Sequence, residues 1–257
     1  MKNSTTPISS KAAQRGEPSY IWRAGQERRF EMIRAAAGPG LHGRVLDAGC
    51  GVGEYLSRLE QEADQAVGLE VELERCQDAF QKCGQVLYGN GEKMPFAENT
   101  FDMALSHEVL EHVHDDRQVV EEIVRVLKPH GRLIVFVPNR GYLFETHGIY
   151  WRGRYRFGNK FLVNYLPRKW RNTLAPHVRA YSRRDLDALF SKLPVKVVQR
   201  TVIFGAYDNI IARMPWLGKT LRSILQWLES TPLKFFGLSH FWVLEKRLTL
   251  REYLKEG

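Results

Sequence analysis

The chain has 257 residues, 44% of them hydrophobic and 26% charged, which is the composition of an ordinary globular protein and suits one domain with insertions. The formal net charge of +9 is uneven: residues 140–200 carry 14 Lys and Arg against 3 acidic residues, a net of +11, so the remainder carries −2. Cys50, Cys76 and Cys83 are too few and too irregularly spaced for a disulfide framework or a zinc knuckle, so we expect small packing residues in a reducing, cytoplasmic compartment.

The N-terminal end is polar. Residues 1–19 contain no apolar run, so we expect a disordered leader and no signal peptide. No later stretch approaches the ~20 apolar residues that span a bilayer. We therefore expect residues 20–257 to form a single cytoplasmic domain that can still touch the inner face of a membrane.

Short apolar runs alternate with helical patterns along the rest of the chain, which predicts βαβ units and a parallel sheet. We expect a Rossmann-like, doubly wound, mostly parallel sheet with helices on both faces. The seven predicted strands are residues 44–48, 65–70, 85–88, 101–105, 132–137, 195–203 and 241–246. The predicted helices are residues 26–37, 72–82, 116–127 and 183–189.

Two segments, at about residues 139–180 and 205–240, are too long for simple connections, and we expect substrate or lid inserts at the sheet rim. The first is basic and aromatic, which favours an anionic, partly apolar partner; a solvated face or a lid packed on the sheet is the structural alternative. The second carries Trp216, Leu217, Ile224 and Trp227, which can anchor to a membrane surface. Basic and aromatic residues also hold single-stranded RNA, but no recognised RNA-binding module accompanies them, so we do not expect a nucleic acid.

The strongest chemical signal is DAGCGVG, residues 47–53, directly after the first predicted strand. Three glycines at a strand-to-helix turn let a ligand approach the backbone closely, and the helix N-terminus attracts an anion. Asp47, however, would repel a phosphate and attract an ammonium group. The turn therefore favours an amino-acid zwitterion, such as the methionine half of S-adenosylmethionine (SAM), over a pyrophosphate.

An acidic residue, Glu70, ends the second predicted strand. A carboxylate at this position can accept hydrogen bonds from both hydroxyls of a bound ribose. Nicotinamide enzymes use the same device, so Glu70 indicates a nucleoside cofactor without naming it.

Four further motifs follow in order: GNGEKMPF at residues 89–96, FD at 101–102, EVLEH at 108–112 and LKPHG at 127–131. With the glycine turn and the acid after strand two, they resemble the class I SAM-dependent methyltransferase family, in its type 11 (quinone-biosynthesis-like) branch. The resemblance covers about residues 44–139. It implies the predicted fold, SAM as cofactor and methyl transfer as activity.

The resemblance also implies roles. Asp47, Gly49 and Gly51 would line the methionine end of SAM, and Glu70 would hold the ribose hydroxyls. The remaining residues expected at the cofactor are Cys50 and Gly53 in the turn, Val71 against the adenine, Asn90 and Gly91 where the family usually has Asp and Ala, and Ser106 at the rim after the fourth strand.

EVLEH suggests a second site. A helical spacing of i, i+3, i+4 would put Glu108, Glu111 and His112 on one face, where they are plausible ligands for a divalent metal, with His147 or His177 as the extra ligand. Capping and rim packing are the structural alternative.

The acceptor is the least defined element. We expect a small-molecule or lipid-linked acceptor methylated at oxygen, with His107, His147 and His177 as candidate bases because imidazole titrates near neutrality. One alternative is a metal-assisted O-methyltransferase acting on a ribose or catechol hydroxyl. Another is a SAM-binding protein without catalysis.

Overall fold

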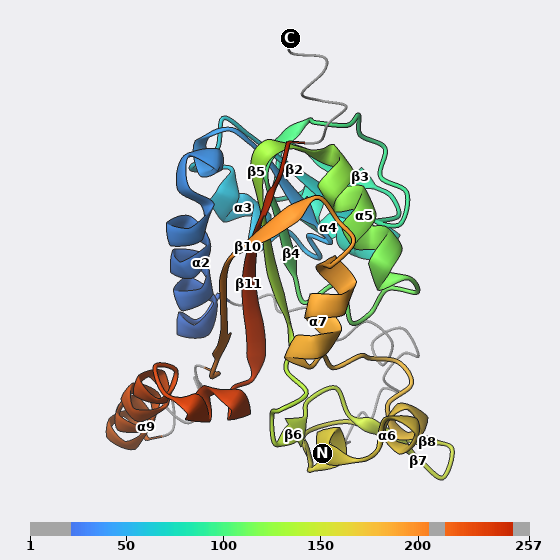
Figure 1. Cartoon of the computed structure of the whole chain (residues 1–257), viewed down its shortest axis with the longest axis vertical. Coiled ribbons are helices and arrows are strands. Elements are labelled where there is room, and N and C mark those ends of the chain that lie inside the picture. The colour runs from blue at the N-terminus through green and yellow to red at the C-terminus, as the bar shows by residue number, and fades with distance from the viewer. Residues whose placement is uncertain (1–21, 206–213, 249–257) are drawn as a thin grey trace, which may run out of the picture.

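The computed structural model describes residues 22–205 and 214–248 of the chain. The expected leader, residues 1–19, lies outside the described residues, as do residues 206–213 of the second expected insert. The described part is a mixed α/β fold built on one large sheet (Figure 1).

The large sheet has seven strands in the order β10-β11-β5-β4-β1-β2-β3. The five strands from β5 to β3 pair in parallel, whereas β11 pairs antiparallel with both β5 and β10. The predicted doubly wound, mostly parallel sheet is therefore confirmed. Its strands are β1 (Arg44–Ala48), β2 (Gln65–Glu70), β3 (Val86–Tyr88), β4 (Phe101–His107), β5 (Leu127–Pro138), β10 (Val195–Ile203) and β11 (Ser239–Lys246).

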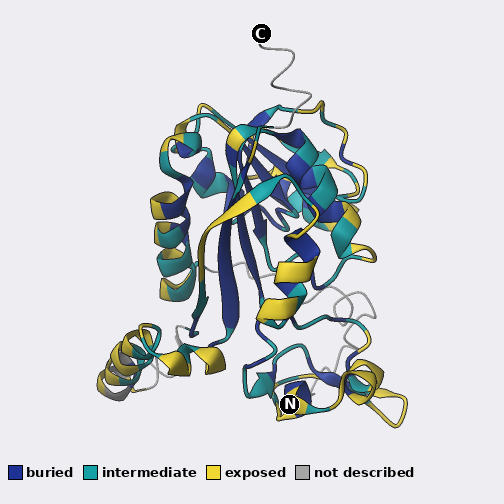
Figure 2. Cartoon of the chain, viewed as in Figure 1, coloured by how far each residue is buried: buried dark blue, intermediate teal, exposed yellow. Residues whose placement is uncertain are grey.

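Helices cover both faces of this sheet (Figure 1). One face packs against α2 (Ala24–Ala37), α3 (Leu56–Leu59) and α4 (Leu73–Phe80). The other packs against α5 (Asp116–Val126) and α7 (Arg183–Phe190). The inner strands β1, β2, β4, β5 and β11 are largely buried because helices cover both of their faces, whereas the edge strand β10 is largely exposed (Figure 2).

Three strands are longer than their sequence patterns predict. β4 continues to His107, so Ser106 and His107 lie within the strand and not after it. β11 begins two residues earlier than expected, at Ser239. β5 begins at Leu127, five residues earlier than expected, and its first part contains a bulge: Phe101 pairs with Leu127 but Met103 pairs with Arg132. His130 has a φ of 65° there, which a continuous pleat does not allow.

Both expected inserts lie beyond the carboxyl edge of the sheet (Figure 1). The first is an irregular layer of short elements: β6 (Phe144–Glu145), β7 (Ile149–Trp151), β8 (Arg154–Arg156), β9 (Lys160–Phe161), the 3-10 helix η2 (Val163–Tyr165) and α6 (Arg168–Leu174). The second contains α9 (Pro215–Leu228) and the 3-10 helix η3 (Pro232–Phe236). A further 3-10 helix, η1 (Gly38–His42), leads from α2 into β1.

The cysteines are buried and unpaired, as expected of packing residues. Among the described residues, no helix combines the length and apolarity needed to cross a membrane.

Candidate cofactor and acceptor site

The carboxyl ends of β1, β2 and β4 meet at one edge of the sheet and enclose a cavity of about 280 Å³. We call it the glycine-bend cavity. Its lining includes Gly49, Gly51, Glu70, Val71 and Asn90, all of which the sequence assigns to the cofactor. Ligands in open parallel sheets bind in this position, where neighbouring connections leave in opposite directions.

The glycines of the bend are there for conformational and steric reasons. Gly49 and Gly51 have φ values of 93° and 56°, which side chains rarely tolerate. A Cβ on Gly49 would lie 2.5 Å from Cγ2 of Val109, whereas a Cβ on Gly51 would meet nothing within 4 Å. The backbone at Gly51 therefore faces open space in the cavity, as close approach by a ligand requires.

Glu70 locks this bend in place. Its carboxylate, only 6% exposed, accepts from the Gly51 amide at 2.9 Å and from the Glu72 amide at 2.8 Å. Each oxygen keeps a further lone pair for a ligand. The end of β2 thus fixes the loop that follows β1.

Asp47 is buried and incompletely paired. It is 2% exposed, and its Oδ2 has no hydrogen-bond partner among the described residues. Burial, together with the charge of Glu70, raises the pKa of Asp47 to about 7. The Tyr55 hydroxyl and Ser106 Oγ are also buried without a hydrogen-bond partner among the described residues. Ser106 lies near the end of β4, and the Tyr55 ring packs against His107 of the same strand. These orphaned polar atoms fit the charged end of an amino-acid ligand, which would satisfy them.

The other assigned residues surround the bend. Val71 is 42% exposed, and Asn90 Oδ1 accepts from the Glu92 amide at 2.9 Å, which orients its side chain. Five assigned residues are not in the lining of the glycine-bend cavity: Asp47, Cys50, Gly53, Gly91 and Ser106. Gly53 instead packs against Cys83 and Ala79.

Glu108 does not lie on a helix, so the helical-face argument for EVLEH was wrong. Its φ is 56°, and α5 begins only at Asp116, where the Asp115 side chain caps the helix. Glu108 accepts instead from Arg29 at 2.9 Å and from Ser239 at 3.0 Å. Burial raises the pKa of Glu108, but the charges of Arg29 and His107 outweigh it and lower the pKa to about 2.

Arg29 was missed because α2 carries none of the recognised motifs. Its guanidinium also contacts His107 Nε2 at 2.8 Å. Burial and the Arg29 charge lower the pKa of His107 to about 3. This arrangement disfavours His107 as a base, because the guanidinium occupies the nitrogen that would receive a proton.

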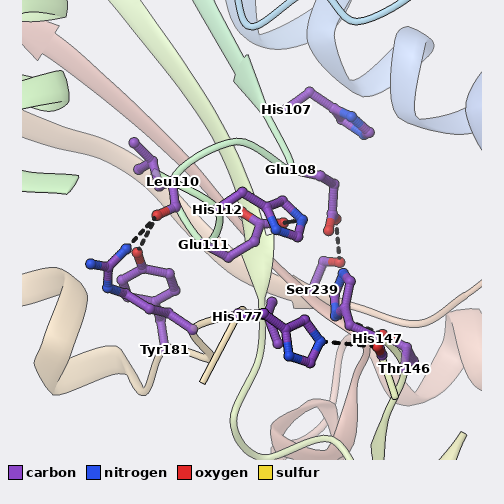
Figure 3. A network of polar contacts seen from close by, with 12 residues as sticks. His107, Glu108, Leu110, Glu111, His112, Thr146, His147, His177, Tyr181 and Ser239 are labelled. Atoms are coloured by element: carbon purple, nitrogen blue, oxygen red, sulfur yellow. Dashed lines mark hydrogen bonds and ion pairs between the residues drawn. The ribbon is translucent and has the colours of Figure 1, made fainter. Parts of the chain in front are cut away.

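The side chains of Glu111, His112 and His147 come together, as Figure 3 shows. His147 reaches this cluster from the loop after β6, as the sequence allowed for an extra ligand. Both Glu111 oxygens are buried without a hydrogen-bond partner among the described residues. Burial and the neighbouring Glu108 raise the pKa of Glu111 well above its usual value.

A second cavity of about 800 Å³ adjoins the first and shares His112 with it. We call it the histidine cavity; its lining also includes Glu111, Tyr150 and His177. The ring of His177 contacts the backbone oxygen of His147 through Nε2 at 3.1 Å, while its Nδ1 is buried without a partner (Figure 3).

A third cavity of about 460 Å³ shares Asn172 and Arg179 with the histidine cavity. Its lining is rich in arginine, so we call it the arginine cavity; it includes Arg117, Arg140, Arg168, Arg171 and Arg179 against Asp116 and Asp185. The three cavities therefore form a continuous series from the glycine bend into the basic insert.

Residues 46–135 match the family model described as a methyltransferase domain. Over 116 residues the chain is 31% identical to a probable S-adenosylmethionine-dependent methyltransferase of Mycolicibacterium smegmatis, a match that covers 44% of this chain and 45% of that protein. It is 28% identical to the demethylmenaquinone methyltransferase of Bacillus licheniformis, covering 60% of this chain and 71% of that one. The chain thus spans less than half the length of the first of these relatives.

Solved structures share the fold. A SAM-dependent methyltransferase from Mesorhizobium loti superposes with a TM-score of 0.58 at 17% identity, covering 84% of this chain and 96% of that one. At this identity, the superposition supports the shared fold and no more.

The orphaned carboxylate of Asp47 gives a first prediction. Asp47→Asn keeps the shape of the side chain and removes the charge that would pair with the ammonium of SAM. A hydrogen bond to a charged group contributes roughly 1.5–3 kcal/mol, so SAM should bind about tenfold or more weakly in isothermal titration calorimetry. Unchanged affinity would mean that the methionine end lies elsewhere.

The raised pKa of Asp47 adds a pH dependence. In the free protein, the carboxyl is neutral below about pH 7 and ionised above it. Because a bound ammonium favours the ionised form, SAM affinity should fall about tenfold for each pH unit below this pKa. The fall should appear in calorimetric titrations of the wild type at successively lower pH and be absent from Asp47→Asn. A wild-type affinity independent of pH would contradict this assignment.

Glu70 gives a second prediction. Adenosine has the ribose of SAM but no ammonium group, so its binding distinguishes the role of Glu70 from that of Asp47. Glu70→Gln leaves one acceptor oxygen for two backbone amides and a ribose, so both SAM and adenosine should bind about tenfold or more weakly. Asp47→Asn should leave adenosine binding intact. The control is Glu74→Gln, the same charge change on the exposed side of α4. Equal losses of adenosine binding in the Asp47 and Glu70 variants would refute the division of roles.

Proposed function

On the premise that residues 46–135 are a class I SAM-dependent methyltransferase domain of the type 11 branch, we propose that this protein transfers the methyl group of SAM to a small-molecule or lipid-linked acceptor, at oxygen. One observation carries the proposal. The glycine bend, locked by Glu70 and backed by the unpartnered Asp47, opens directly into a second, larger cavity.

The bend would hold the cofactor by its two ends. Glu70 accepts from the ribose hydroxyls, Asp47 pairs with the ammonium group, and Val71 and Asn90 meet the adenine. When bound, SAM supplies an electrophilic methyl group on a sulfonium. The chain's contribution is then to align an acceptor atom with that methyl group, and alignment of this kind lowers a barrier by several kcal/mol (roughly 7–11 in well-oriented systems).

The histidine cavity would hold the reacting end of the acceptor, because it shares His112 with the glycine-bend cavity. Among the three candidate bases, His177 is the best placed. Since its Nε2 lies at a backbone oxygen, that nitrogen carries the hydrogen and Nδ1 keeps an unused lone pair. His147 Nδ1 lies 3.1 Å from a carboxylate oxygen of Glu145 and donates to it.

The arginine cavity would hold an anionic group at the far end of the acceptor. Arg140 donates to the backbone oxygens of Asn164 and Leu166, at 3.3 and 3.1 Å, and no carboxylate of the described residues forms an ion pair with it. Burial and the nearby Arg168 charge lower its pKa. An anion would relieve this crowding of like charges, so we infer an elongated acceptor with a carboxylate or phosphate at one end.

The second insert would meet a membrane surface. On α9, Trp216 and Trp227 are 80% and 66% exposed, and Ile224 is 51% exposed; the helical spacing puts all three on one side. Figure 2 shows this helix largely exposed at the end of the molecule that carries both inserts. Exposed indoles beside Lys234 suit an interface with anionic lipid headgroups, which would bring a lipid-linked acceptor to the site.

The function is tested by incubating the purified chain with methyl-deuterated SAM and extracts of deletion cells, followed by mass spectrometry. We expect one class of metabolite to gain one labelled methyl group, and the same class to lack that group in the deletion strain. Binding of SAM without any labelled product would favour the non-catalytic alternative.

Arg140→Gln extends this test to the acceptor. Loss of one charged contact should lower transfer to an anionic acceptor by about tenfold or more while leaving SAM affinity unchanged. The matched control is Arg154→Gln, the same charge change on the exposed β8 strand. If both variants, or neither, lose transfer, the anion does not lie in the arginine cavity.

Co-sedimentation with vesicles of anionic phospholipid tests the membrane contact. Replacing Trp216 and Trp227 together by alanine should weaken binding roughly tenfold or more, because each buried aromatic side chain contributes about 1.5–3 kcal/mol. Trp170→Ala, on the equally exposed α6, should have no effect. Wild-type protein that stays in the supernatant would exclude this surface.

A further inference from the structure

Three side chains from two segments converge where the glycine-bend and histidine cavities meet. Glu111 and His112 come from the turn after β4, and His147 comes from the loop between β6 and β7 (Figure 3). One potential ligand atom from each lies within 4.8 Å of the other two. Ligands at about 2 Å from a metal lie roughly 3–4 Å apart, so a small adjustment of these side chains would bring all three ligand atoms onto one ion.

The side chain of Glu111 is buried, and no contact within the described residues explains why a carboxyl group lies there. It is 1% exposed, and neither carboxylate oxygen has a hydrogen-bond partner among the described residues. Leaving a buried carboxylate unsatisfied costs several kcal/mol, so a native structure normally supplies a donor or a cation. Arg29 pairs with the neighbouring Glu108 and not with Glu111.

His147 is oriented as metal-binding histidines are. Its Nδ1 donates to Glu145 Oε1 at 3.1 Å, and Glu145 is itself held by Arg171 at 2.5 Å. A carboxylate that accepts from one ring nitrogen fixes the tautomer and leaves the lone pair on the other. Glu145 and Arg171 are themselves buried, so this support for His147 is held within the insert.

We propose that Glu111, His112 and His147 bind one divalent transition-metal ion. Two imidazoles and one carboxylate suit Zn²⁺, Fe²⁺, Mn²⁺ or Co²⁺ better than Mg²⁺ or Ca²⁺, which prefer all-oxygen sites. Three protein ligands leave a position open, and Glu111 and His112 both line the histidine cavity. The set differs from the one expected from EVLEH, in that His147 takes the place of Glu108.

The role of this metal site depends on the proposed function, methyl transfer to an acceptor oxygen. An acceptor hydroxyl that coordinates the open position loses its proton to solvent more readily, and the resulting oxygen lone pair forms the new bond to the methyl carbon as the carbon–sulfur bond breaks. In a five-coordinate ion two positions are open, and two neighbouring hydroxyls, as in a ribose or a catechol, would chelate it. The acceptor class that such a site would suit is a vicinal diol.

The test measures metal binding alone, without SAM or acceptor. Full-length protein is stripped with a chelator and titrated with Co²⁺ and Zn²⁺ by absorption spectroscopy and calorimetry. We expect one ion per chain and a visible Co²⁺ spectrum typical of few-coordinate nitrogen and oxygen ligands. Absence of stoichiometric binding by the wild type would overturn the proposal.

Matched variants assign the ligands. Glu111→Gln and His147→Gln should each weaken binding by about 100-fold or more, a larger loss than the 10–100-fold typical of outer-shell changes. His114→Gln, which alters an exposed histidine lining the same two cavities, should bind as the wild type does. Equal affinity in all three variants would place the ion elsewhere and refute the site.

Two further measurements keep the result interpretable. SAM binding by Glu111→Gln and His147→Gln reports that each variant is folded, because neither residue lies in the glycine bend. If the wild type binds no metal but still binds SAM and transfers methyl groups, only the proposed metal site is refuted. If the wild type does not bind SAM, the proposed function itself is refuted.

Discussion

The hydrogen bond from the Gly51 amide to Glu70 is the contact on which the rest of the site depends. It ties the loop after β1 to the end of β2 at 2.9 Å and holds the bend with its backbone open toward the cavity. Because Glu70 is nearly buried, this bond is formed in a region of low dielectric, where a charged acceptor is held strongly. The bend is therefore organised before any ligand arrives, and binding does not have to order it.

The strand order explains why the cavities lie in a series. β1 is central, and the chain moves outward to β2 and β3 on one side before it returns to β4 and β5 on the other. The proposed cofactor side of the edge is thus built early in the sequence, from residues 47–90. The proposed acceptor side is built later, from the turn after β4 and from the insert after β5. A sheet of this kind allows the insert to change without disturbing the glycine bend.

The sequence predicted those features of the structure that depend on interactions between residues close together in the chain. The boundaries of β1 and β10 are as their apolar runs indicate, and the glycine bend and Glu70 lie where their motifs place them. The prediction from EVLEH was wrong because i, i+3, i+4 spacing defines a face only inside a helix. The helix α5 begins after EVLEH, at the Asp115 cap. Arg29 was beyond reach for another reason: it meets Glu108 across 79 residues, a contact that no periodicity reveals.

Glu108 and Glu111 show how one short turn separates two carboxylates into different roles. Glu108 faces Arg29 and Ser239, so its charge joins α2 to β11 and is neutralised within the fold. Glu111 faces the insert, where the basic side chains turn toward Glu145, backbone carbonyls or the arginine cavity. Glu111 is buried without a hydrogen-bond partner among the described residues, and His112 Nε2 lies 4.0 Å from its Oε1. A buried carboxyl group left in this way costs free energy that a bound ion or ligand would recover, so the proposed metal site gives Glu111 a role that its neighbour Glu108 does not need.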